Sequence, residues 1–100
     1  MEGSALKKFD LVIEAVRYEN GQITQVRAYE RRGAAFSDRV LIDRADLVQR
    51  LEKGKKAVTG QRKEFMAGTF DLGKPIQTVG KFVSTRTDAS RDELEGVPVF

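Results

Sequence analysis

The chain has 100 residues, of which 40% are hydrophobic and 33% are charged, and its formal net charge is +3 with a pI of about 9.4. These values predict one globular domain over residues 1–100, without the run of roughly 20 apolar residues that a membrane-spanning helix needs. The sequence has no cysteine and no histidine. Disulfides, thiolate chemistry and the commonest general base near neutral pH are therefore excluded, and we expect a cytoplasmic, non-enzymatic protein without a cofactor or a metal.

Residues 1–8 are expected to form a frayed lead-in to a β-hairpin over residues 9–32. Its two arms flank Asn20-Gly21, the pair that best tolerates the positive φ angles of a type I′ turn. A two-residue loop sets Glu19 opposite Gln22. The register that follows pairs Tyr18 with Ile23, Val16 with Gln25, Ala15 with Val26, Glu14 with Arg27, Ile13 with Ala28 and Val12 with Tyr29. Both faces are apolar, so each needs a cover.

A third strand over residues 39–42 and a helix over residues 44–53 are predicted next. Asp43 is typical of a helix N-cap, and Asp46 three residues later completes a pattern that resembles a capping box. Gly54 is typical of the residue that ends a helix in left-handed geometry. Apolar side chains at helical spacing indicate that one side of this helix packs on the sheet.

The second half of the chain predicts short strands over residues 56–59 and 62–66, joined by a turn at Gly60-Gln61. An irregular loop is expected over residues 67–74, and a last strand over residues 76–84 with a bulge at Gly80. Residues 85–93 have the polar composition of a mobile linker. The apolar residues of 94–100 should then dock back on the domain, because exposing them would cost several kcal/mol.

These elements predict a β-rich α+β fold of five or six mostly antiparallel strands in a small, partly open barrel, with one helix after the third strand. Their order resembles a family of small bacterial and phage proteins known only as a domain of unknown function. The resemblance rests on a V-R-x-x-x-G-x-I hairpin, a helix ending in Gly, the strand AVTG and a terminal L-x-x-V-P-x-F. The matching positions are Val16, Arg17, Gly21, Ile23, Gly54, Val58, Leu94, Val97, Pro98 and Phe100. The family implies this architecture and no known activity.

Basic side chains are concentrated between residues 50 and 63, where six of them face one acidic residue, a local charge of +5. This candidate binding surface comprises Arg50, Lys53, Lys55, Lys56, Arg62 and Lys63. Such a block either contacts phosphates or is a solvated surface that complements the end of the helix. The acidic pairs are assigned to helix capping and to the mobile linker, so neither predicts a metal site.

Two classes of partner are carried forward, and neither involves a membrane. A protein partner is slightly favoured, because only Tyr18, Tyr29 and Phe65 could stack on nucleic-acid bases and Tyr29 is expected to be buried. The sequence therefore predicts a small protein-interaction module, with nucleic-acid binding through the basic block as the alternative. Strand pairing between hairpins leaves a monomer or a weak homodimer open.

Overall fold

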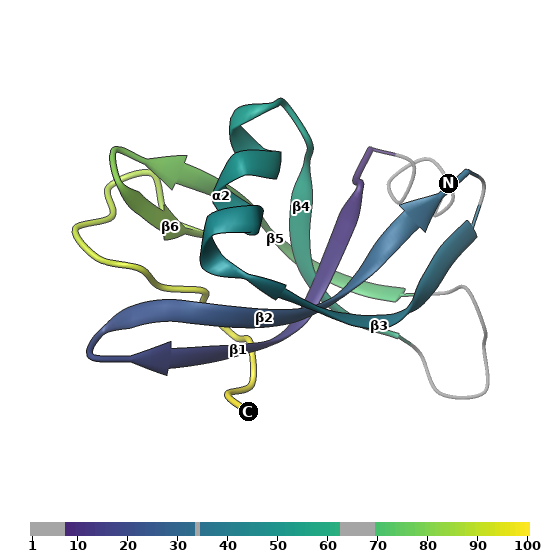
Figure 1. Ribbon diagram of the computed structural model, residues 1–100, viewed down its shortest axis with the longest axis horizontal. Helices are drawn as coiled ribbons and strands as arrows, with labels where there is room; N and C mark the ends of the chain where they lie inside the picture. The colour runs from purple at the N-terminus through teal and green to yellow at the C-terminus, as the bar shows by residue number, and fades with distance from the viewer. Residues whose placement is uncertain (1–7, 34, 63–69) are drawn as a thin grey trace.

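A computed structural model describes residues 8–33, 35–62 and 70–100, which form a six-stranded sheet and one helix (Figure 1). The elements are β1 (Leu11–Glu19), β2 (Gln22–Arg32), β3 (Ala35–Asp43), α2 (Arg44–Glu52), β4 (Ala57–Arg62), β5 (Phe70–Val79) and β6 (Phe82–Ser84). In the sheet their order is β3-β2-β1-β4-β5-β6, with β1 and β4 parallel and the other pairs antiparallel. The β-rich α+β class and the helix after the third strand are confirmed.

The sheet is open, because β3 and β6 form its two edges and do not pair with each other. The predicted partly open barrel therefore finds no support in the described strands. The sheet is nevertheless strongly curved. The rings of Phe36 in β3 and Phe70 in β5 are 5.2 Å apart, although three strands lie between β3 and β5 in the sheet order.

The hairpin turn has the predicted geometry, with φ angles of 53° at Asn20 and 79° at Gly21. The strands beyond it contain two irregularities that the predicted register lacks. Thr24 is an extra residue in β2, since Tyr18 pairs with Ile23 and Arg17 with Gln25. Glu14 is an extra residue in β1, since Ala15 pairs with Arg27 and Ile13 with Ala28.

The bulge on β2 shifts the register by one residue, and the bulge on β1 shifts it back. Predicted pairs outside the two bulges are therefore right, and those between the bulges are wrong. Tyr18–Ile23, Ile13–Ala28 and Val12–Tyr29 are confirmed, while Val16–Gln25 and Ala15–Val26 are wrong. Glu14 and Arg27 do form an ion pair of 2.7 Å, although they are not directly opposite. Between the bulges Val16 faces the same way as Leu11 and Ile13, so that all three join the core under α2.

The helix begins at Arg44 as predicted and ends at Glu52, one residue before the predicted end. The Asp43 carboxylate accepts the N–H of Asp46 at 2.8 Å, and Gly54 follows the C-cap Lys53 with a φ of 91°. Leu47 is fully buried against the sheet. The helix therefore covers one sheet face, and a smaller core of Val12, Tyr29, Val58 and Phe70 lies on the other. The single helix of the described residues has nine residues and is too short to cross a membrane.

The predicted turn at Gly60-Gln61 is wrong, because β4 runs through both residues. A Cβ on Gly60 would lie 2.7 Å from the Asp71 carbonyl oxygen and 3.0 Å from a Val12 methyl group, so close packing requires glycine here. The predicted loop of 67–74 is also wrong from residue 70 onward, where β5 begins. Residues 63–69 lie outside the described residues. Gly80, with a φ of 60°, lies in the turn between β5 and β6 and is not a bulge.

The chain after β6 returns to β1 and runs along the part of its edge that β4 leaves open (Figure 1). The Val16 N–H donates to the Pro98 carbonyl at 2.9 Å, and the Phe100 N–H donates to the Val16 carbonyl at 3.0 Å. Leu94 is buried in the main core, and its N–H donates to the Tyr18 hydroxyl at 3.0 Å. Residues 94–100 thus contribute both apolar and backbone contacts to β1.

Candidate binding surface

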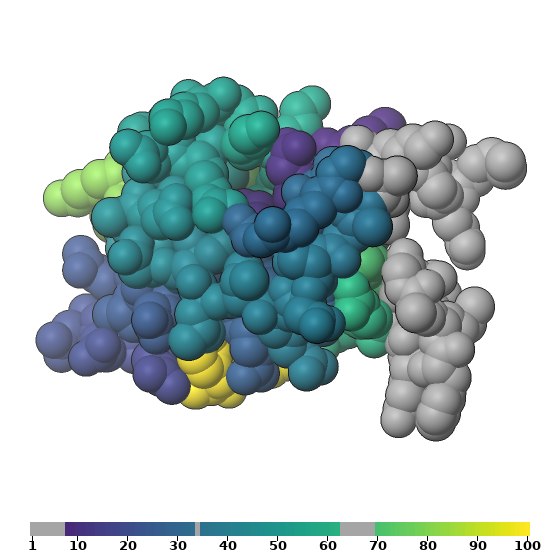
Figure 2. Space-filling view, turned by 45° about the vertical axis from the view of Figure 1, so that its right-hand side comes forward, coloured from purple at the N-terminus to yellow at the C-terminus, as the bar shows by residue number. Residues whose placement is uncertain are grey.

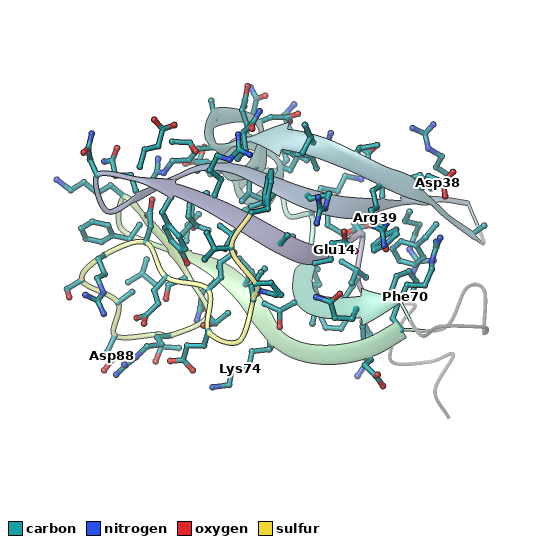
Figure 3. The ribbon with its side chains drawn as sticks, turned by 90° about the horizontal axis from the view of Figure 1, so that it is seen from below. Glu14, Asp38, Arg39, Phe70, Lys74 and Asp88 are labelled. Carbon is teal, nitrogen blue, oxygen red and sulfur yellow. The ribbon has the colours of Figure 1, made fainter. Side chains whose placement is uncertain are left out.

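Glu14 lies at the centre of a polar cluster on the sheet face that α2 does not cover (Figure 3). Its side chain is 5% exposed. The carboxylate accepts hydrogen bonds of 2.7 Å each from the Tyr29 hydroxyl and from Arg27 Nε. It also forms an ion pair of 2.7 Å with Arg39 Nε, which donates to the Tyr29 hydroxyl at 3.1 Å. The backbone carbonyl of Glu14 accepts from Gln61 Nε2 at 2.8 Å. The bulge thus places a carboxylate between three donors from β2 and β3.

The surroundings of Glu14 keep it ionised. Burial raises the pKa of its carboxyl, but the hydrogen bonds from Tyr29, Arg39 and Arg27 outweigh burial and hold that pKa below its ordinary value. Burial and the hydrogen bond to Glu14 raise the pKa of the Tyr29 hydroxyl. A carboxylate with a lowered pKa is a poor proton acceptor at neutral pH, so the cluster favours a binding or structural role over acid-base chemistry.

The Arg62 guanidinium packs on the ring of Tyr29. Its guanidinium carbon lies 4.4 Å from the Tyr29 ring centroid and 5.2 Å from that of Phe70. Its terminal nitrogens donate to the Ser37 carbonyl at 3.3 Å and lie 3.7 Å from Asp38 Oδ1. The Tyr29 and Phe70 rings are 1% and 8% exposed, so the guanidinium takes the place a stacking base would need.

Two more arginine contacts extend this face toward the chain terminus. The guanidinium carbons of Arg17 and Arg27 lie 4.6 Å and 5.0 Å from the Phe100 ring centroid. Arg17 Nε also donates to the Phe100 carbonyl at 3.2 Å. We call the surface formed by Arg17, Arg27, Arg39 and Arg62 the arginine face. Sequence spacing did not reveal it, because its members come from four different strands.

The structure describes five of the six predicted site residues, and they lie in two regions, at the end of α2 and on the arginine face. Lys53, Lys55 and Lys56 are exposed at the end of α2 and in the loop before β4. Arg50 bonds Glu30 at 2.6 Å and Asp46 at 3.0 Å. Arg62 belongs to the arginine face, about 16 Å along β4 from Ala57 at roughly 3.3 Å per residue. Lys63 lies outside the described residues.

A groove of about 500 Å³ lies between α2 and the ends of β1 and β2. Its charged lining residues are Asp10, Glu30, Arg31, Asp46, Arg50, Lys53 and Lys55. Four cationic and three anionic side chains nearly balance, and Arg50 is already paired with two of those carboxylates. The groove thus collects three members of the basic block without forming a strongly positive surface.

Asp92 is a buried, hydrogen-bonded residue whose role the sequence did not indicate, because it lies in the predicted mobile linker. Its side chain is 1% exposed. The carboxylate accepts the N–H groups of Ile23 and Val83, each at 2.9 Å, and two bonds from Arg44 at 2.9 and 3.1 Å. Burial raises the pKa of Asp92, yet the bonds from Arg44, Val83 and Ile23 bring it below its ordinary value. No local pattern signals this role, since two partners are 48 and 69 residues away.

The edge strand β3 adds a free backbone edge beside the arginine face. It has nine residues and pairs only with β2 among the described strands. The opposite edge, β6, has three residues, and its Ser84 forms a bridge to Glu93. Leu41 of β3 is 60% exposed, and the Arg39 side chain is 63% exposed. Figure 2 shows β3 and α2 as neighbouring parts of one molecular surface.

Comparison with known proteins gives no relative. No family model matches the chain, and neither a curated protein nor a solved structure is significantly similar to it. The resemblance to a domain of unknown function therefore stays a prediction. Within residues 8–33, 35–62 and 70–100, no three acidic side chains are grouped as metal ligands.

Proposed function

We propose that the protein is a non-enzymatic interaction module that binds an extended segment of a partner protein along β3. The observation that carries this proposal is the outer edge of β3, which pairs with no other described strand and is regular from Arg39 to Asp43. Its ladder with β2 is irregular at Ser37 and Asp38, where Arg62 donates to the Ser37 carbonyl. An unpaired strand edge offers a row of backbone donors and acceptors to which another strand can add. Natural proteins usually shorten or cover such edges, as the shorter β6 edge illustrates.

The side chains of β3 support partner binding over simple protection of the edge. Asp38, Arg39 and Asp43 are charged and would discourage indiscriminate pairing. Leu41 exposes 60% of its surface in the same strand, so an apolar side chain is available to a partner there. An edge with both charges and an exposed apolar residue suits selective pairing. The same edge would also allow a weak homodimer through pairing of two β3 strands.

Nucleic-acid binding is the second candidate. It is supported by Lys53, Lys55 and Lys56, which are exposed and have no ion-pair partner in the described part of the chain, and by the arginine face. It ranks lower because the Tyr29 and Phe70 rings lie beneath Arg62, so bases cannot stack on them. A labelled single-stranded oligonucleotide titrated at low salt tests this candidate, whose affinity must fall steeply as salt rises.

The main proposal is tested with a random nonapeptide library displayed on phage and selected on the whole chain. The best peptides are synthesised, and amide hydrogen exchange is measured with and without each of them. We expect peptides to slow exchange along β3, and we expect Leu41→Lys to weaken their binding at least about tenfold, since a buried leucine contributes roughly 1.5–3 kcal/mol.

Val99→Lys is the matched control, because Val99 is an apolar residue that is 67% exposed and lies away from β3, in the terminal segment. It should bind the peptides as the wild type does. Selection of no peptide, or peptides that leave exchange of β3 unchanged, would refute strand addition at this edge.

A further inference from the structure

We propose that the partner segment carries an acidic side chain that binds Arg27 and Arg39, and an apolar side chain two residues away that packs on Leu41. This inference rests on the proposed function and names the chemistry of the partner. It follows from the unused hydrogen-bond donors of two arginines and from the register of β3.

Arg27 and Arg39 hold one carboxylate between them. Each Nε lies 2.7 Å from the same atom, Glu14 Oε2, so the two guanidinium groups converge on one oxygen. Two guanidinium groups against one buried carboxylate leave one positive charge without a counter-charge in this cluster. The structure thus provides two converging cations and a single anion.

The terminal nitrogens of both guanidiniums remain available. A guanidinium has five N–H donors, and only the Nε donors of Arg27 and Arg39 bond residues in the described part of the chain. Their side chains are 40% and 63% exposed. Glu14 therefore holds the Nε side of both groups, and their terminal nitrogens have no hydrogen-bond partner among the described residues. Such pre-positioned guanidiniums suit a carboxylate, which accepts two parallel bonds.

The register places this cation pair beside an exposed apolar side chain. Arg39 pairs with Tyr29 and Leu41 pairs with Arg27, so Arg39 and Leu41 lie on the same face of β3, two residues apart. A strand added to β3 would also present every second side chain to that face. An acidic residue next to Arg39 then places the residue two positions on next to Leu41. The matching partner has the pattern acidic-x-apolar or its reverse.

A carboxylate fits this site better than a nucleic-acid backbone. Asp38 and Asp43 are exposed in the same strand and would repel a continuous chain of phosphates. The aromatic rings of the site are buried, as described above, and offer no surface for bases. A single acidic side chain brings one negative charge near these aspartates, whereas a phosphate backbone would bring several.

The test compares the peptides selected on the wild type with those selected on Arg39→Gln. We expect wild-type peptides to contain Asp or Glu two positions from an apolar residue, and we expect this preference to disappear on Arg39→Gln. The best wild-type peptide should bind Arg39→Gln about ten times more weakly, because it loses a hydrogen bond to a charged group. Replacing its acidic residue by the amide should have the same effect on the unaltered protein, whatever the stability of the variant.

Arg91→Gln is the control, because it removes the same charge from an exposed side chain in the segment after β6. It should leave peptide affinity unchanged. Peptides that protect β3 without an acidic preference would overturn this inference and leave the proposed function standing. Failure of every peptide to protect β3 would overturn both. An oligonucleotide whose binding is lost in Arg39→Gln would assign the arginines to nucleic acid and overturn the inference.

Discussion

Replacing Asp92 by alanine should destabilise the protein more than any other substitution in the segment between β6 and the terminus. Asp92 joins three distant elements, because its carboxylate binds Ile23 in β2, Val83 in β6 and Arg44 in α2. Alanine would leave two buried backbone N–H groups without an acceptor. Arg44, whose side chain is 28% exposed, would lose both of its bonds to the carboxylate but could still reach water.

The size of the effect follows from those contacts. Each orphaned buried N–H costs about 1–3 kcal/mol. Breaking a buried ion pair by removing one partner typically costs about 3–5 kcal/mol. We therefore expect Asp92→Ala to lose about 3–5 kcal/mol, a large share of the roughly 5–15 kcal/mol by which a domain is stable. Asp92→Asn should lose nearly as much, because an amide has one oxygen where the two N–H groups need two acceptors.

Urea denaturation followed by circular dichroism measures this loss as a lower midpoint at an unchanged slope. Asp88→Ala is the control, since Asp88 is an exposed residue of the same segment and its ion pair among the described residues is with Arg86. Its effect should stay within about 0.5 kcal/mol. A loss below about 1 kcal/mol for Asp92→Ala would show that the segment does not anchor the sheet and is the mobile linker that its composition predicts.

Two further perturbations test the bulge and the packing of β4. Glu14→Gln should cost about 1–3 kcal/mol at pH 7, and the difference from the wild type should shrink as pH falls below about 4. The folded-state pKa of Glu14 is depressed, so its contribution is present above the unfolded-state pKa and is lost as the carboxylate protonates; denaturation curves at pH 7, 5 and 3 measure this, and a constant difference contradicts it. Gly60→Ala should cost about 1–3 kcal/mol, because its methyl group would overlap the Asp71 carbonyl oxygen. An unchanged melting temperature for Gly60→Ala would rule out that close approach.

Local features that depend on neighbouring residues were predictable. The Asn20-Gly21 turn, the Asp43 cap and the glycine after the helix each depend on conformations that few residue types adopt. The turn predicted at Gly60 was wrong because glycine is needed there for close packing and not for a positive φ angle. A glycine in sequence indicates a turn or a close approach equally well, and only the neighbouring β5 strand shows which is present.

The sequence by itself determined the β-rich α+β class, the hairpin turn and the start of the helix, because these rest on periodicity and on conformational preferences over a few residues. Only the tertiary structure decided the two bulges. Their register shifts are opposite, so the strand pairs at both ends of the hairpin are the same as without them. The tertiary structure also decided which charged side chains lie close to one another. The arginine face gathers side chains from four strands, and Asp92 binds groups as far as 69 residues away. Contacts between residues so distant in sequence depend on how the strands are ordered and curved, which no local pattern records.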